Sequence, residues 1–392
     1  MFSIRTYNKI SDKGLSLFPD ENYQVGEGES SPDGIVLRSH KLHGEKLPES
    51  VCAVARAGAG TNNVPVDEYS KSGIVVFNSP GANANAVKEL VLAGMLLSSR
   101  GILEGHNYVS TLTEMTDAQE MSVLMEKEKK RFAGSELAGK TLGIVGLGAI
   151  GSLVADAALS LGMEVLGYDP ALSVEAAWRL SSSVQRQESL EAMLPKVDYL
   201  SLHVPAIEAT KNLINAATLK LMPARAVVLN FAREAIVDTR AMVDALNAKK
   251  LRRYICDFPE PLLIARDDVL ALPHIGASTA EAEENCAVMA VRQLRDYLEN
   301  GNIRNSVNFP ATSMPRTEGT YRITFSNRNV SGVLSDVLGV IARHNVNVAD
   351  LVNKSRGDLA YSILDLDAQP SAALLDEIRS QEPVIALRCV GA

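Results

Sequence analysis

The run at residues 146–151, GLGAIG, constrains the fold of this 392-residue chain more than any other feature. It follows the apolar run 142–145 and precedes the helix-favouring stretch 152–160. Glycines at this spacing, between a strand and a helix, let backbone N–H groups approach a diphosphate at the helix N-terminus. Asp169 ends the next apolar run, where a carboxylate accepts from a ribose 2′-hydroxyl and repels a 2′-phosphate. The sequence therefore predicts a dinucleotide-binding unit that takes NAD rather than NADP.

Short apolar runs alternate with helical stretches on both sides of this loop, which is typical of parallel sheets covered on both faces. We expect helices at 85–99, 152–160 and 279–301, the last stopped by Asn300-Gly301. The predicted strands form two series, one at 34–39, 51–58 and 73–80, the other at 141–148, 164–170, 197–205, 226–232, 252–259 and 269–276. The fold class is therefore α/β, with two Rossmann-like doubly wound lobes.

The last third of the chain has a different pattern. Residues 305–320, with two prolines and few apolar residues, read as a linker. Residues 321–390 follow with a βαββαβ order, the ferredoxin-like arrangement. Residues 105–139, rich in Glu, Lys, Met and Ser, are predicted to form a surface helix without chemistry.

Composition narrows the function classes. A net charge of −8 and a pI near 5.4 disfavour a nucleic-acid surface, so an anionic substrate must meet a local basic cluster. The four cysteines are scattered singly, as in a reducing compartment, and no metal site is expected. We find no signal-peptide core and no apolar run near the ~20 residues that span a bilayer. We therefore expect a cytoplasmic protein without a membrane partner.

Four polar residues lie at or just beyond the ends of later predicted strands and suit hydride transfer: Arg233, Asp257, Glu260 and His274. The carboxyl ends of strands in a doubly wound sheet face one crevice, so these side chains can converge there. A histidine serves as base for a hydroxyl proton, and a carboxylate at its other nitrogen raises its pKa. An arginine can bind a substrate carboxylate with both arms of its guanidinium.

Several longer motifs resemble the D-isomer-specific 2-hydroxyacid dehydrogenase family. They are KTLGIVGLGAIG, NFAREAIVD, DFPEP and PHIGAST, joined by VLRSHKL, VARAGAGTNNVP and VVFNSPGANANAVKEL in the N-terminal part. The terminal domain looks like an ACT regulatory module, and the resemblance covers nearly the whole chain. Within the family, the chain is most similar to members that oxidise D-3-phosphoglycerate with NAD, the first step of L-serine biosynthesis. The resemblance thus implies a phosphorylated 2-hydroxy acid as substrate.

The resemblance also implies roles for individual residues. His274 would be the acid/base, Glu260 its partner and Arg233 the clamp on the substrate carboxylate. Cofactor contacts would come from Gly146, Gly148, Ala149, Ile150, Gly151, Asp169, His203, Val204, Pro205, Phe231, Ala232, Asp257 and Gly276. Substrate contacts would come from Arg38, Arg56, Ala57, Gly58 and Asn78, with Arg38 a candidate for the phosphate.

The implied architecture has a discontinuous substrate-binding domain of residues 1–98 and 281–313, an NAD-binding domain of 99–280 and an ACT-like domain of 318–392. The chain departs from the family at two places. Glu234 follows Arg233 where glycine is usual, and Glu260 lies three residues after Asp257 where five is usual.

For the terminal domain, Asn329 and Asn347 match positions that hold an amino-acid effector in serine-inhibited relatives. Here Asn327 and Ser331 replace a usual histidine and proline. L-serine inhibition and a purely oligomerising role both stay open, and we expect a homodimer or homotetramer.

Two alternatives to the main interpretation also stay open. One is another enzyme of the family, a hydroxypyruvate, glyoxylate or 2-oxoglutarate reductase. The other is an NAD-sensing binding protein.

Overall fold

The computed structural model describes residues 1–391, except the side chain of residue 175. Ala392, the last residue of the predicted domain 318–392, lies outside the described residues. The chain packs as two compact units. Unit 1 is Met1–Asn83 with Thr279–Ala392, and unit 2 is Ala84–Ser278. In unit 2 the helix 84–99 packs with the predicted NAD-binding half, whereas we expected residues up to 98 in the other lobe; the domain limits stay a prediction.

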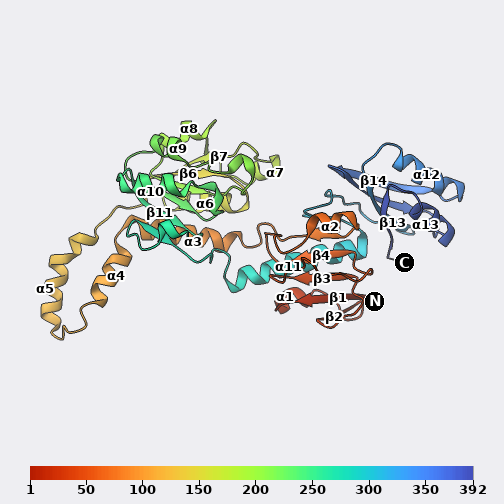
Figure 1. Cartoon of the computed structure of the whole chain (residues 1–392), viewed down its shortest axis with the longest axis horizontal. Coiled ribbons are helices and arrows are strands. Elements are labelled where there is room, and N and C mark those ends of the chain that lie inside the picture. Colours follow the sequence, from red (N-terminus) through yellow and green to blue (C-terminus); the bar gives the residue numbers. More distant parts are fainter. Residues whose placement is uncertain (392) are drawn as a thin grey trace. The chain divides into compact units, whose positions relative to one another are not determined.

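Unit 1 is built on a five-stranded parallel sheet of order β2-β1-β3-β4-β5 (Figure 1). Its strands are β1 (Phe2–Tyr7), β2 (Tyr23–Gly26), β3 (Gly34–Leu37), β4 (Ala53–Arg56) and β5 (Val75–Phe77), and its helices are α1 (Asp12–Leu15), α2 (Val66–Lys71) and α11 (Ala280–Asn300). The side chain of Thr279 caps α11 by accepting from the Ala282 N–H, and Gly301 ends the helix at φ +73°, as its sequence predicts.

Unit 2 holds a seven-stranded parallel sheet of order β12-β11-β10-β9-β6-β7-β8. The strands are β6 (Thr141–Val145), β7 (Glu164–Tyr168), β8 (Gln185–Arg186), β9 (Tyr199–Leu202), β10 (Ala226–Asn230), β11 (Leu251–Cys256) and β12 (Val269–Ala271). The helices are α3 (Ala84–Ser99), α6 (Ala149–Ser160), α7 (Val174–Ala177), α8 (Leu190–Met193), α9 (Ala216–Leu221) and α10 (Thr239–Asn247), with 3-10 turns η2 (Leu194–Lys196), η3 (Glu208–Thr210), η4 (Glu234–Ile236) and η5 (Pro261–Leu263). β9 and β10 are buried along their whole length, as expected where helices cover both faces. The predicted doubly wound α/β class is confirmed.

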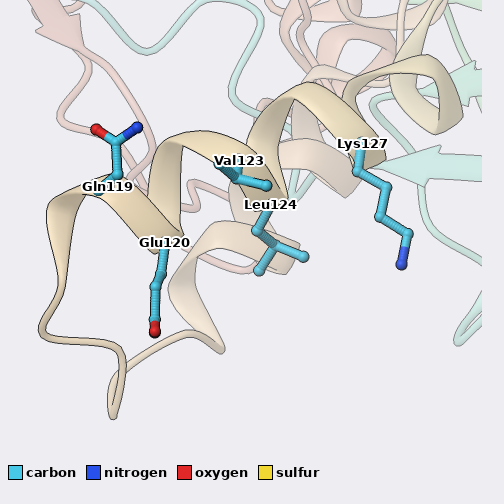
Figure 2. Close-up of a pocket in the computed structure, with 5 residues that line it drawn as sticks. All are labelled: Gln119, Glu120, Val123, Leu124 and Lys127. Carbon is cyan, nitrogen blue, oxygen red and sulfur yellow. The ribbon is translucent and has the colours of Figure 1, made fainter.

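Two helices and a 3-10 turn form an arm between α3 and β6, where we predicted a single surface helix. They are α4 (Ile102–Ser110), α5 (Ala118–Glu128) and η1 (Lys129–Phe132) (Figure 1). The helix is interrupted between Ser110 and Ala118. Asp117 is the N-cap of α5, and its carboxylate accepts hydrogen bonds from two backbone N–H groups. Neither α4 nor α5 contains a buried residue, and Figure 2 shows the apolar Val123 and Leu124 on α5 among polar neighbours.

The terminal domain confirms the predicted βαββαβ order. It consists of β13 (Tyr321–Arg328), α12 (Val333–Arg343), β14 (Val348–Arg356), β15 (Leu359–Leu366), α13 (Ala372–Arg379) and β16 (Val384–Val390). These strands form an antiparallel sheet of order β14-β15-β13-β16. An apolar cluster that includes Ile323, Val337 and Leu364 fills the space between this sheet and its helices.

A buried arginine joins this domain to the rest of unit 1. Arg322 forms a bidentate ion pair with Asp365, at 2.7 and 2.8 Å. It also donates to the carbonyls of Asn300, at the end of α11, and of Met314 and Pro315 in the connecting segment, at 2.8–3.0 Å. Both side chains of the pair are fully buried.

The connecting segment 305–320 is more than a solvated linker. Phe309 is buried, and so is Asn308, whose side chain donates to the carbonyl of Ile74 and accepts from the N–H of Val76. The segment therefore packs along β5 of unit 1. No helix among the described residues combines the length and apolarity needed to cross a bilayer.

Candidate active site

The glycine loop joins β6 to α6, as predicted, and its geometry requires glycine at two positions. Gly146 has φ +90°, and a Cβ there would lie 2.7 Å from the carbonyl oxygen of His203. A Cβ on Gly151 would lie 2.0 Å from the carbonyl oxygen of Gly146. By contrast, nothing lies within 4 Å of the Cβ position at Gly148, the N-cap of α6, and no side chain caps that helix.

This loop is a suitable cradle for the diphosphate of NAD. The first turn of α6 carries Ala149, which is exposed, and Ile150, which is half-buried. Its N-terminus, without a side-chain cap beside open space, offers backbone N–H groups and the positive end of the helix dipole. The residues present therefore fit the cofactor that the sequence predicts.

Asp169 lies just beyond the end of β7 and supports the loop. Its Oδ2 accepts from the backbone N–H of Leu147 at 2.8 Å, and Oδ1 accepts from that of Ala171. The carboxylate is half-buried. It is thus fixed beside the glycine loop, where we expect the adenosine ribose.

His203, Val204 and Pro205 follow β9 on the other side of the loop. The His203 N–H donates to the Val145 carbonyl, and its Nε2 lies 2.8 Å from Ser201 Oγ. Burial lowers the pKa of His203 to about 4, so the imidazole is neutral at pH 7. Its Nδ1 is buried and has no hydrogen-bond partner among the described residues.

His274 stands in a turn that Asp257 holds. Oδ1 of the buried Asp257 accepts from the Ile275 N–H at 2.8 Å, and Oδ2 from the Gly276 N–H at 2.7 Å. The carboxylate of Asp257, which we predicted to contact the cofactor, therefore binds the backbone beside His274, the predicted acid/base. His274 itself is exposed and adopts φ +56°, which is uncommon for a residue with a side chain.

Phe258 lies against two of the predicted catalytic side chains. Its ring centroid is 4.7 Å from that of His274, and the guanidinium carbon of Arg233 lies 5.7 Å from the same centroid. Arg233 is exposed and donates to the carbonyl of Ala232. The structure thus brings Arg233 and His274 to one aromatic ring.

The loop that carries Arg233 is fixed by the buried Asn230. The Asn230 amide donates to the carbonyl of Arg233 at 2.8 Å and accepts from the N–H of Ala232 at 3.1 Å. Phe231, between them, is buried. Asn230 was not among the residues that the sequence singled out.

Glu260 has a different partner from the one we expected. Its Oε1 accepts a hydrogen bond from Oγ1 of Thr239, the first residue of α10. No hydrogen bond joins Glu260 to His274 among the described contacts. The partnership stays a prediction.

In unit 1, two arginines follow adjacent strands. Arg38 follows β3, and Arg56 ends β4 and donates through Nε to the Arg38 carbonyl at 3.1 Å. Arg38 is paired with Glu283 of α11, Nη2 to Oε1 at 2.7 Å, with 40% and 44% of the two side chains exposed. Cys286, one turn further along α11, has its pKa raised by burial, while Arg56 and Arg38 oppose that rise.

The backbone around Arg56 is tightly held. The N–H of the buried Ala57 donates to the Leu37 carbonyl, and a Cβ on Gly58 would lie 2.1 Å from Nη1 of Arg56. The Asn78 amide donates to the Ala59 carbonyl at 2.6 Å. Gly58 and Asn78 thus shape the loop that presents Arg56.

The two effector candidates lie in turns at either end of α12. Asn329 donates through its side chain to the Gly357 carbonyl at 3.0 Å. Asn347 is exposed, and its N–H donates to Asp367 Oδ1.

Sequence reasoning missed Phe258, Thr239, Asn230 and Glu283. The first two act through contacts distant in sequence, which no local pattern reveals. Asn230 carried a usable signal, because a polar residue that ends an apolar strand is buried only when it bonds a neighbouring loop.

Comparisons with known proteins identify two family domains in the chain. Residues 92–276 match the family model of the D-isomer specific 2-hydroxyacid dehydrogenase NAD binding domain, and residues 321–383 match that of the ACT domain.

Among curated relatives, a D-3-phosphoglycerate dehydrogenase of Haemophilus influenzae is 34% identical over 340 residues, 84% of this chain and 78% of the relative. One from Escherichia coli K12 is 35% identical over 337 residues, 83% of this chain and 77% of the relative. Among solved structures, NAD+-bound 3-phosphoglycerate dehydrogenase of Entamoeba histolytica has a TM-score of 0.60 and 24% identity, and covers 78% of this chain and 98% of that chain.

Proposed function

The chain belongs to the D-isomer-specific 2-hydroxyacid dehydrogenase family, and we propose that it oxidises D-3-phosphoglycerate to 3-phosphohydroxypyruvate with NAD+ as cofactor. The observation that carries the proposal is the joint presence of the glycine cradle and of Arg233 and His274 on one ring. The choice of D-3-phosphoglycerate as substrate rests on the curated relatives, which are named D-3-phosphoglycerate dehydrogenase.

In this reaction His274 takes the proton of the substrate hydroxyl. A bound NAD+ would supply the acceptor for the hydride that leaves the carbon bearing this hydroxyl. The turn that Asp257 fixes sets the direction in which the imidazole points. In the reverse reaction the protonated imidazole returns the proton to the carbonyl oxygen.

Arg233 binds the substrate carboxylate. A guanidinium can donate two parallel hydrogen bonds to a carboxylate, which orients the adjacent carbon as well as holding it. The Phe258 ring lies beside the guanidinium and restricts where it can move. Glu260 is the predicted partner of His274 and would have to leave Thr239 to reach it.

Arg38 and Arg56 bind the phosphate of the substrate. Arg38 comes directly after β3 and Arg56 is the last residue of β4, so both lie at the carboxyl edge of the unit 1 sheet, where ligands bind in open parallel sheets. A phosphate dianion must displace Glu283 from Arg38. That ion pair is the observation that favours the second candidate, reduction of an unphosphorylated acid such as hydroxypyruvate or glyoxylate.

The test is NADH oxidation with a panel of 2-oxo acids: 3-phosphohydroxypyruvate, hydroxypyruvate, glyoxylate and 2-oxoglutarate. We expect the highest kcat/KM with the phosphorylated acid. A higher value with any other member would transfer the assignment to that substrate, and binding of NADH without turnover of any of them would favour an NAD-sensing protein.

We also propose a homodimer or homotetramer in the cytoplasm, with L-serine as effector. The apolar side chains exposed on the arm and the exposed strand β14 at the edge of the terminal sheet support self-association. Calorimetry with L-serine tests the effector: binding that is lost in Asn329→Ala with Asn347→Ala supports it, and no heat at millimolar serine leaves the domain to assembly alone.

A further inference from the structure

A basic cavity of about 450 Å³ lies in unit 2 at the edge of the sheet opposite the glycine loop. Parallel strands place their carboxyl ends, and with them the cofactor, at one edge. The residues that line this cavity lie at the opposite, amino-terminal edge of the sheet, where β10 and β11 begin, and at the base of the arm. Its lining residues are Ser98, Ser99, Arg100, Gly101, Ala133, Gly134, Ser135, Arg225, Arg252 and Arg253.

Four arginines line this cavity in a chain whose net charge is −8. Among the described residues, the only carboxylate that pairs with any of them is that of Glu104, on Arg253. Arg252 donates instead to the neutral Tyr199 hydroxyl at 3.1 Å, and its Nε is buried with no partner in the described part of the chain. The residues that line the cavity therefore carry more positive than negative charge, and one of the lining arginines has a buried donor without an acceptor.

The cavity walls join the two ends of the arm to the sheet. The Ser135 N–H donates to the Ser99 carbonyl at 3.0 Å, so the outgoing and returning chains lie side by side. Arg253 donates to the Leu97 carbonyl at 3.3 Å, whereas Arg252 reaches Ser135 Oγ only at 3.4 Å. An acceptor placed among these groups would bind both the base of the arm and the sheet.

We propose that this cavity is a second anion site, which takes a phosphate group independently of substrate and cofactor. A phosphate offers several acceptor oxygens in the geometry that guanidinium groups and serine hydroxyls match. The bound phosphate offsets part of the positive charge of the clustered arginines and links the arm to the sheet.

The test is calorimetric titration of inorganic phosphate into the full-length protein with saturating NAD+, against sodium chloride at matched ionic strength. We expect wild type to bind phosphate, and Arg100→Gln with Arg225→Gln to weaken that event at least tenfold. Both side chains are exposed and make no ion pair in the described part, so the double variant should fold and bind NADH as wild type does.

Two matched variants separate this site from the others. Arg186→Gln removes an exposed arginine elsewhere in unit 2 and should leave the binding unchanged. Arg38→Gln removes the proposed substrate phosphate contact and should also keep the event. Three results would overturn the proposal. They are loss of phosphate binding in Arg38→Gln, wild-type phosphate affinity in the double variant Arg100→Gln with Arg225→Gln, and a phosphate signal no larger than that of chloride. Phosphate binding that occurs only as the protein dissociates would also overturn it, because an acidic group of a second copy would then fill the cavity.

Discussion

The two units hold their candidate site residues by different means. In unit 2, the side chains of Asp257, Asp169 and Asn230 bond the backbone of the loops that carry function. In unit 1, Arg38 is held by the exposed carboxylate of Glu283, which is itself an anion of the kind that we propose the arginine binds.

The candidate site in unit 2 is therefore formed before any ligand binds, whereas in unit 1 a ligand must replace the carboxylate of Glu283. Backbone N–H groups bound to a buried carboxylate remain in place whether or not a ligand is present, which favours precise alignment of a reacting group. An exposed ion pair contributes about 0–1 kcal/mol and can be replaced by a stronger anion. We therefore expect unit 2 to fix the geometry of the reacting groups and unit 1 to set substrate selectivity through competition between Glu283 and a phosphate. Four changes test this contrast.

The largest expected effect is on chemistry in unit 2. His274→Ala should reduce kcat by about 10²–10⁴-fold, since a general acid–base group contributes that much. Binding of NADH, measured by fluorescence titration, should stay near wild type because the glycine loop is untouched. Turnover equal to wild type would remove His274 from the mechanism.

Acid should destabilise unit 2 through His203. Burial lowers its folded pKa to about 4 from 6.5, so protons bind the unfolded state preferentially between these values. The contribution of His203 to the free energy of unfolding, about 3 kcal/mol, is fully present above pH 6.5 and is lost as the pH falls toward 4. Hydrogen exchange should show this loss in β9 of wild type, and His203→Gln should flatten the dependence. An unchanged pH profile in the variant would contradict the assignment.

Asp169→Ala should change cofactor choice in the candidate site of unit 2. It removes a ribose acceptor, a charge that repels a 2′-phosphate and the acceptor of the Leu147 N–H. We expect NAD binding to weaken about 10–150-fold, since one such hydrogen bond to a charged group is worth about 1.5–3 kcal/mol. The preference for NAD over NADP should narrow. A wild type that already prefers NADP would refute the role of Asp169.

The smallest effect is expected in the candidate site of unit 1. Glu283→Gln should lower KM for 3-phosphohydroxypyruvate severalfold without changing kcat, because a competing carboxylate worth at most about 1 kcal/mol is removed. KM for hydroxypyruvate should not move. Glu284, next to Glu283 on α11, pairs with Lys13 of α1, and Glu284→Gln is therefore the matched control. Equal shifts for both substrates would mean that Glu283 does not compete with a phosphate.

Much of this architecture was predictable because it follows from short-range pattern. The glycine loop, the buried strands of unit 2 and the βαββαβ order all depend on spacing within a few dozen residues. β1 escaped prediction because the run Phe2–Tyr7 alternates apolar with polar residues and has no strong boundary before it. The arm was predicted as one helix because the break at Asp117 is a capping event without glycine or proline.

Less of the candidate site than of the fold could be predicted from the sequence. His274 and Arg233 stand out as polar residues after apolar strands, and the structure brings both to Phe258. Their supports did not stand out, since the Glu260–Thr239 bond spans 21 residues and the Arg38–Glu283 pair spans most of the chain. Such pairings depend on how elements pack, which a single sequence does not specify.

The buried pair of Arg322 and Asp365 bears on how this chain could be recombined with others. Arg322 donates hydrogen bonds to three stretches of chain, including the last turn of α11. The terminal domain therefore cannot be removed without breaking buried hydrogen bonds to the rest of unit 1. A truncation before Thr317 would strip the Asn300 carbonyl of its buried donor, and a grafted domain would need an arginine at the same place. Successful chimeras should therefore exchange α11, the connecting segment and the terminal domain as one inheritable block.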